Sequence, residues 1–296
     1  METTGRTGLI LKWSRRIRWA LMSAVLVYLG LCGYMWATQR HHIFEPKPQI
    51  QTTPDRMGMK FEEVTIPSGS GDEHGELSAW WIPAERTAVP TVLYLHGNDK
   101  NMGHSHDLET VARLHAMGYN LLTIDYRGYG KSTGGEPSEA KVYEDAEAAW
   151  NYLAKLHGSD PKTTFIYGHS LGGAIAIDLA LHHPEAGGLI AESTFTTMAD
   201  MGKHDYAYMP ADILLNQRFD SLGKVGALKI PLLFIHGSWD RRIPYQMSQR
   251  LFASAPQPKF LKLIEHGEHN NNSSIAPLEY RAAVSEFIQH YSVKNE

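Results

Sequence analysis

The stretch "FIYGHSLGGAIAIDLA", residues 165–180, decides the fold of this chain. An apolar run of strand length leads into an apolar run of helix length, and the five residues between them read G-x-S-x-G. A serine at such a junction is typical of a nucleophile elbow, a strained turn that exposes the hydroxyl at the top of a sheet. Glycines on both sides remove side chains that would clash in so tight a turn. We therefore predict that Ser170 is a nucleophile; the alternative is an ordinary serine at a helix start.

Strand-like and helix-like segments alternate around this stretch. The expected strands are 61–67, 77–82, 91–96, 120–125, 163–167, 188–191, 231–236 and 259–264. The expected helices are 107–117, 138–156, 171–182, 245–254 and 278–291. Runs such as "TVLYLH" are nearly all apolar, as in strands that are buried on both faces. The alternation predicts an α/β fold, with a mostly parallel central sheet and helices on both faces.

A serine hydroxyl is a weak nucleophile without a base, and the base needs an orienting acid. In this architecture the chain order is Ser, then Asp or Glu, then His. Asp240 follows the apolar run "PLLFIHG", and its alternative role is an ion pair with Arg241 or Arg242. His266 and His269 follow the last expected strand. We predict His269 as the base, because it lies deeper in the loop before the final helix.

Two further groups complete the expected site. The backbone N–H of Leu171, directly after the serine, and that of Asn98 in "LYLHGN" are placed to form an oxyanion hole. A short cap insert is expected at about 194–230, with room for one or two short helices. Its apolar residues Phe195, Met198 and Met201 are candidates for an acyl-binding wall, and the alternative is that they pack on the sheet.

The segment "GHSHD", residues 103–107, hints at a metal-dependent hydrolase, but the Asp-His that should follow is replaced by Leu-Glu. We interpret it as a helix start capped at the surface. No metal ion and no organic cofactor is predicted.

The quoted motifs "LYLHGN", "DYRGYGKSTGGEPSE", "GHSLGGAIA", "HGSWDRRIP" and "GEHNN" resemble the α/β-hydrolase superfamily. The resemblance covers about residues 55–292 and is closest to the membrane-anchored α/β-hydrolase domain-containing proteins, which include depalmitoylases, lysophospholipid lipases and esterases. It implies Ser170, Asp240 and His269 as nucleophile, acid and base, and Asn98 and Leu171 as the oxyanion positions. Asp99 and Lys100 depart from the small residues that many relatives have after "HGN".

The N-terminal region has a separate character. Residues 19–37 carry no charge, five basic residues precede them, and the length suits one crossing of a bilayer. We expect a basic cytoplasmic segment (1–18), a transmembrane signal anchor (19–38), a linker (39–60) and the hydrolase domain (61–296). The positive-inside bias places the domain on the extracytoplasmic side, periplasmic or lumenal. The alternatives are a cleaved signal peptide, a lipoprotein signal at Cys32 and a buried soluble helix.

Composition limits the function further. The net charge of −4 gives no reason to expect nucleic acid, and the single cysteine excludes an intramolecular disulfide. The oligomeric state stays open. We predict a serine hydrolase that cleaves esters or thioesters of small acyl or lipid-like substrates through an acyl-enzyme. We also predict that a chain shortened to begin near Met57 keeps its turnover on soluble esters. The alternatives are a serine peptidase of the same fold and a catalytically idle, membrane-tethered binding module, which a serine-directed fluorophosphonate would not label.

Overall fold

The computed structural model describes residues 3–71, 74–156 and 158–293; parts of the predicted N-terminal segment and of the turn at 68–76 therefore lie outside it. In the described part of the chain, eight strands form one sheet in the order β10-β9-β8-β7-β4-β6-β3-β2. All its neighbours are parallel except β3, which runs antiparallel to β2 and β6. These strands are β2 (Glu62–Ser68), β3 (Gly75–Ile82), β4 (Thr91–Leu95), β6 (Asn120–Ile124), β7 (Thr164–His169), β8 (Gly188–Glu192), β9 (Leu232–Gly237) and β10 (Lys259–Ile264).

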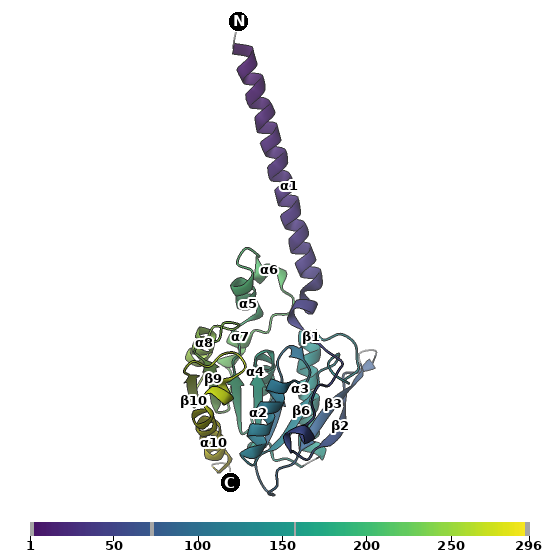
Figure 1. Ribbon diagram of the computed structural model, residues 1–296, viewed down its shortest axis with the longest axis vertical. Helices are drawn as coiled ribbons and strands as arrows, with labels where there is room; N and C mark the ends of the chain where they lie inside the picture. The colour runs from purple at the N-terminus through teal and green to yellow at the C-terminus, as the bar shows by residue number, and fades with distance from the viewer. Residues whose placement is uncertain (1–2, 72–73, 157, 294–296) are drawn as a thin grey trace.

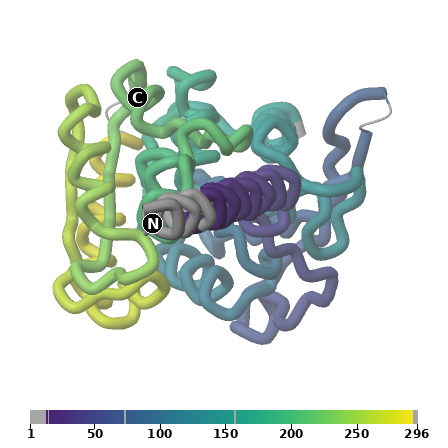
Figure 2. Tube along the Cα trace, turned by 90° about the horizontal axis from the view of Figure 1, so that it is seen from above, coloured from purple at the N-terminus to yellow at the C-terminus, as the bar shows by residue number. Residues whose placement is uncertain are grey.

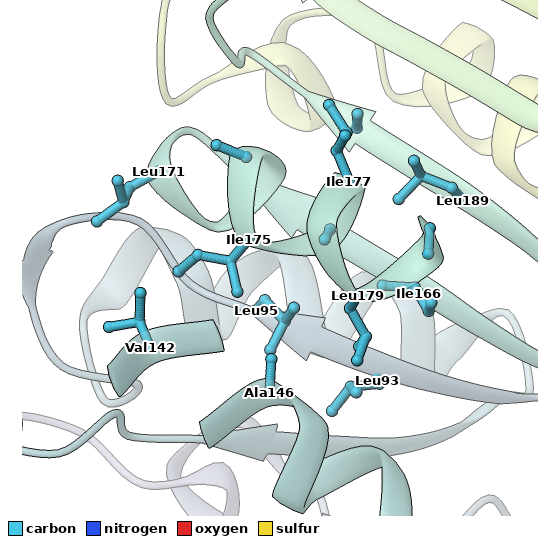
Figure 3. Close-up of a cluster of buried hydrophobic side chains, with 14 of the residues drawn as sticks. Leu93, Leu95, Val142, Ala146, Ile166, Leu171, Ile175, Ile177, Leu179 and Leu189 are labelled. Carbon is cyan, nitrogen blue, oxygen red and sulfur yellow. The ribbon is translucent and has the colours of Figure 1, made fainter. Parts of the chain in front are cut away.

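Helices cover both faces of this sheet (Figure 1). The larger ones in the domain are α2 (Ser105–Ala116), α3 (Glu139–Leu156), α4 (Leu171–His182), α8 (Gln246–Ser254) and α10 (Pro277–Val293). One apolar core joins α3, α4 and α8 to the sheet, and a second core joins α2 and α10 to the other side. Figure 3 shows the first core, where Ile175 and Leu179 of α4 lie against Leu93 and Ile166 of the central strands. The predicted α/β-hydrolase architecture is confirmed, with element boundaries within a few residues.

The expected cap insert contains three short helices rather than one or two, and all its residues are described. They are α5 (Met198–Asp205), α6 (Ala211–Leu214) and α7 (Ser221–Val225). α7 lies against α4 and α8 and belongs to the domain, and its Val225 is part of the core. Only α5 and α6 rise above the domain (Figure 1). We use "cap" for residues 198–215.

The N-terminal helix α1 (Thr3–Ile43) is longer than the predicted anchor at both ends. Its part from Arg15 to Ile43 is long and apolar enough to cross a membrane. Seen from above, α1 stands over the body of the domain (Figure 2). A helix of this composition continues through the basic residues because none of them breaks an α-helix.

The segment predicted as a linker, residues 39–60, is not a free connection. It begins inside α1, and its β1 (Glu45–Pro46) pairs in parallel with β5 (Asp99–Lys100), directly after Asn98. Phe44 is buried and packs edge-to-face on Phe219, with ring centroids 6.0 Å apart. The part of the chain that the structure describes also contains the short 3₁₀ helices η1 (Pro54–Met57) and η3 (Pro161–Thr163) and the turn helix α9 (Asn272–Ile275). The sequence did not predict this packing of residues 44–46 on the domain, because the prolines remove the periodicity by which a strand is recognised.

Candidate active site

Ser170 lies in a strained turn between β7 and α4. Its backbone has φ 55° and ψ −119°, a positive φ that non-glycine residues rarely adopt. A Cβ atom at Gly168 would overlap the carbonyl oxygen of Gly172, and one at Gly172 would overlap that of Leu95. The two glycines of the motif are therefore required by close backbone contacts, and the strained geometry predicted for the elbow is present.

Three loops at the carboxyl ends of β7, β9 and β10 bring Ser170, Asp240 and His269 together. The Nε2 atom of His269 lies 3.0 Å from Ser170 Oγ, and its Nδ1 atom lies 2.8 Å from Asp240 Oδ2. The other carboxylate oxygen, Oδ1, accepts the backbone N–H groups of Arg242 and Ile243, each at 2.9 Å. The carboxylate is held by these groups and not by an arginine side chain.

His266, the alternative base, lies elsewhere. It is exposed, has φ 59°, and packs its ring against Trp239 at 4.3 Å between centroids. Of the two histidines in this loop, only His269 contacts Ser170 and Asp240 in the structure.

His236 is a neighbour of the carboxylate that the sequence reasoning missed. Its Nε2 atom lies 3.1 Å from Asp240 Oδ2 and 2.9 Å from the carbonyl oxygen of Ile243, while Nδ1 lies 2.7 Å from Ser248 Oγ. The sequence feature that could have predicted this contact is the spacing of His236 and Asp240, which are four residues apart at the end of a strand. His236, at the end of β9, thus helps to hold Asp240 in position.

Burial and hydrogen bonding set the charge states in this group. Burial lowers the pKa of His269 to about 4, against an opposing effect of the Asp240 carboxylate. Burial alone would raise the pKa of Asp240, but hydrogen bonds from His236, His269 and the Ile243 N–H outweigh it and hold that pKa well below its usual value. At neutral pH the arrangement is a neutral imidazole between a hydroxyl and a carboxylate, which is the state a general base needs.

The predicted oxyanion positions flank the serine. Asn98 and Leu171 line the same hollow as Ser170, and among the described residues neither backbone N–H has a hydrogen-bond partner. Gly97 lies next to the elbow, since an added Cβ would lie 3.4 Å from Ser170 Cβ. The Asn98 side chain is tied down, since its Nδ2 donates to the Ile43 carbonyl and its Oδ1 accepts from Arg242. Two backbone donors are thus free beside the hydroxyl.

An apolar hollow of about 180 Å³ opens from Ser170 toward the cap. The predicted Phe195, Met198 and Met201 line it, and Phe195 is almost fully buried. The structure adds a wall that sequence reasoning did not foresee: Met35, Gln39, His42 and Ile43, from the last turns of α1.

A second, small polar hollow also reaches Ser170 and His269. The helix start predicted in 103–107 is present, since α2 begins at the exposed Ser105, but the segment does not face only the surface: His104, His106 and Asp107 line this hollow. Asp107 is buried, and its Oδ1 accepts the Tyr94 hydroxyl at 2.8 Å. The helix start faces inward since α2 packs Leu108 and Val111 into the second core, which turns its first turn toward His169.

Three residues of this hollow could hold a metal ion. Potential ligand atoms of His106, Asp107 and His169 all lie within 4.8 Å of one another. His169 donates from Nε2 to the His269 carbonyl at 3.0 Å, which leaves its Nδ1 facing Asp107 Oδ1 at 4.0 Å. Burial lowers the pKa of His106 to about 3, so the His106 ring is neutral at neutral pH. The contacts among Ser170, His269 and Asp240 involve none of these three side chains.

Comparison with known proteins gives concordant results. The family model described as serine aminopeptidase, S33, matches residues 87–219. An uncharacterized protein of Escherichia coli, YfhR, is 32% identical over 253 residues, which are 83% of this chain and 85% of that protein. Lysophosphatidylserine lipase ABHD12 of Danio rerio is 33% identical over 67% of this chain and 56% of its own length.

Among solved structures, the esterase Pf2001 of Pyrococcus furiosus superimposes with a TM-score of 0.70 at 22% identity, covering 84% of this chain and 99% of the esterase. At this identity the match shows the fold. Together with the relatives above 30% identity, it establishes that the chain is a hydrolase and belongs to the α/β-hydrolase superfamily, among its ABHD-type members.

Proposed function

We propose that this chain is a serine hydrolase that cleaves carboxylic esters or thioesters of acyl substrates through an acyl-enzyme intermediate. The observation that carries the proposal is the continuous set of contacts Ser170–His269–Asp240, at 3.0 and 2.8 Å, in the order and on the loops expected for a catalytic triad.

In the first half-reaction Ser170 Oγ attacks the substrate carbonyl carbon while His269 Nε2 takes its proton. The Nδ1–H of His269 donates to Asp240, which stabilises the imidazolium that forms. The backbone N–H groups of Asn98 and Leu171 hold the oxyanion, helped by the positive end of α4. His269 then returns the proton to the leaving oxygen or sulfur. Water repeats the sequence on the acyl-enzyme and releases the acid.

The apolar hollow favours an acyl group over a peptide. An aminopeptidase needs a carboxylate to hold the substrate ammonium. In the hollows, Asp107 is buried and accepts the Tyr94 hydroxyl at 2.8 Å, and Asp205 lies at the cap; the two loop candidates from the sequence are Asp99 and Glu136. Asp99 lies in the polar hollow with the Lys100 ammonium 3.7 Å away, and Glu136 is exposed and lines neither hollow. A monoacyl lipid, as in the name of the relative ABHD12, suits one apolar and one polar hollow that meet at Ser170.

We further propose that residues 19–38 anchor the chain in a membrane, with residues 1–18 in the cytoplasm and the hydrolase domain, 61–296, on the extracytoplasmic side. The apolar length of α1 and the basic residues before it support this orientation. A membrane-impermeant maleimide applied to intact cells tests it on a single cysteine at Leu278, which is 81% exposed. Labelling only after permeabilisation would contradict the orientation.

The test of the catalytic proposal is labelling by a fluorophosphonate and turnover of a p-nitrophenyl ester. Ser170→Ala is expected to abolish the label and to lower turnover by a factor on the order of 10⁴ or more. Retention of a tenth of wild-type turnover contradicts the proposed nucleophile. Absence of labelling in the wild-type protein would favour the idle binding module.

A further inference from the structure

The last turns of α1 contact the cap along one stripe of the helix. Tyr28, Cys32, Met35, Gln39 and Ile43 follow one another at spacings of three and four, so they share a face. Cys32 and Gln39 are buried although most of this part of α1 is exposed. The stripe therefore belongs to an interface with the domain.

Specific contacts hold this interface. Tyr28 Oη donates to the Tyr208 carbonyl at 2.9 Å, and Cys32 Sγ lies 3.9 Å from Met209 Sδ. Lower down, Gln39 Oε1 accepts the backbone N–H of Asn216 at 2.8 Å. The cap is thus attached to α1 at both its tip and its base.

These contacts fix how far the cap extends along the apolar segment. Tyr28 is the central residue of the uncharged stretch 19–37, and Arg40 is the first charge after it. Arg40 is twelve positions after Tyr28, which is about 18 Å along a helix at 1.5 Å per residue. When the uncharged stretch occupies a hydrocarbon layer about 30 Å thick, the cap tip lies well below the headgroups, even with a tilted helix.

The surface of the cap suits such a position. Tyr206, Tyr208 and Ile213 are 37%, 63% and 83% exposed, next to the exposed apolar side chains of α1. Lys203 and Asp212 form an ion pair of 2.8 Å, Asp200 pairs with Arg250 at 2.8 Å, and the exposed Asp205 lies at the hollow between the cap and α1. The Tyr208 carbonyl at the tip is satisfied by Tyr28, as irregular backbone in a bilayer requires.

The apolar hollow runs between the same two elements. It begins at Ser170 and reaches Tyr206 and Met209 at the cap tip, with Met35 of α1 as its other wall. A chain whose ester lies at Ser170 therefore points its tail toward the bilayer.

We infer that the cap inserts into the membrane beside α1, and that the hollow between them takes the acyl chain of a monoacyl lipid directly from the bilayer. The inference rests on the proposed hydrolase function for its substrate class, but insertion of the cap is a separate physical claim. We infer that the bilayer covers the exposed apolar surface of the cap, because this surface is continuous with that of the membrane-spanning helix.

Insertion is tested on the full chain in phosphatidylcholine vesicles by fluorescence quenching. Cys32, the only cysteine, is changed to alanine, and a polarity-sensitive fluorophore is placed at Ile213→Cys or at Leu278→Cys. The two sites are matched controls, at 83% and 81% exposure, and Leu278 lies beside Arg113 and Met117, away from the cap. Nitroxide-labelled lipids are expected to quench position 213 at least threefold more strongly. Equal quenching at the two sites overturns the inference.

Substrate access is tested with Ile213→Glu and Leu278→Glu. A charge in the bilayer is costly, so Ile213→Glu is expected to lower hydrolysis of a monoacylglycerol in vesicles by a factor on the order of ten, with turnover of soluble p-nitrophenyl butyrate within about twofold of wild type. Leu278→Glu should change neither. Unimpaired vesicle hydrolysis by Ile213→Glu, or equal loss on both substrates, overturns the inference. Failure of the catalytic proposal appears differently, as activity that survives Ser170→Ala while quenching is unchanged.

Discussion

Replacing Asp240 by asparagine reverses the proton arrangement around His269 with almost no change in shape. Asp240 Oδ1 accepts two backbone N–H groups, those of Arg242 and Ile243, each at 2.9 Å. In Asp240→Asn the amide oxygen of the new side chain must take that place, because the amide NH₂ there would face two donors. The NH₂ group then points at His269 Nδ1, which lies 2.8 Å from the carboxylate in the native protein.

A donor at this position makes Nδ1 an acceptor and places the imidazole proton on Nε2, facing Ser170 Oγ. His269 can then no longer take the serine proton. Loss of the correct tautomer costs about 10⁴ in kcat in a serine protease triad, equivalent to about 5.4 kcal/mol of transition-state stabilisation. His236 Nε2 lies 2.9 Å from the Ile243 carbonyl oxygen, so it stays a donor and opposes one hydrogen of the new amide. The flipped amide would oppose two backbone N–H groups, which is the worse arrangement.

The assay is kcat on a soluble p-nitrophenyl ester at pH 7.5, with thermal unfolding followed by circular dichroism. Asp240→Asn is expected to lose about 10⁴-fold in kcat with little change in melting temperature. Asp178→Asn, which removes a carboxylate paired with Lys224 at 2.7 Å, is the matched control and should keep full turnover. If Asp240→Asn retained more than a tenth of wild-type kcat, the orientation of His269 by Asp240 would be refuted.

Three further predictions concern the same site. His269→Ala should lower turnover on the order of 10⁴-fold and His266→Ala by less than about twofold, as measured on a soluble ester; the reverse order would identify the wrong base. Because His269 must be neutral to act and its pKa is lowered to about 4, kcat/KM should be level from about pH 6 to 8 and fall only as pH drops through 4; a half-point at the ordinary 6.5 contradicts the effect of burial. A chain shortened to begin at Met57 loses Phe44 and the β1 pairing next to Asn98, so it should lose turnover on soluble esters, whereas one beginning at Ala37 should keep it; equal activity of the two would show that β1 is dispensable.

This last prediction differs from the one that the sequence alone suggests. Residues 39–60 contain three prolines and no periodicity, so the sequence alone predicts that a chain starting near Met57 remains active. In the structure, Phe44 and Ile43 are buried in the first core, and the Ile43 carbonyl accepts a hydrogen bond from Asn98 Nδ2 at 2.9 Å. A single apolar residue in an irregular segment gives no periodic signal, so only the folded chain shows which core it enters.

The sheet and the proposed triad could be predicted from the sequence because both depend on local patterns. Apolar runs of five or six residues mark the buried strands, and parallel strands end at one edge of the sheet. Residues that follow β7, β9 and β10 must therefore meet, whatever the loops between them do. The same local patterns predict that Ser170, Asp240 and His269 lie together, and they favour His269 over His266.

The two hollows around Ser170 were decided by tertiary structure. His104, His106 and Asp107 face the serine because α2 packs its apolar side on the sheet, which a motif search cannot foresee. The segment 19–37 is apolar on every side, so its sequence carries no sign of which face meets the domain. Tyr28, Cys32, Met35 and Gln39 differ from their neighbours only by touching a cap about 175 residues further along the chain. Hydrophobic periodicity reveals a difference in polarity between the faces of one helix. Where all faces are apolar, only the tertiary contacts show which face packs against the rest of the protein.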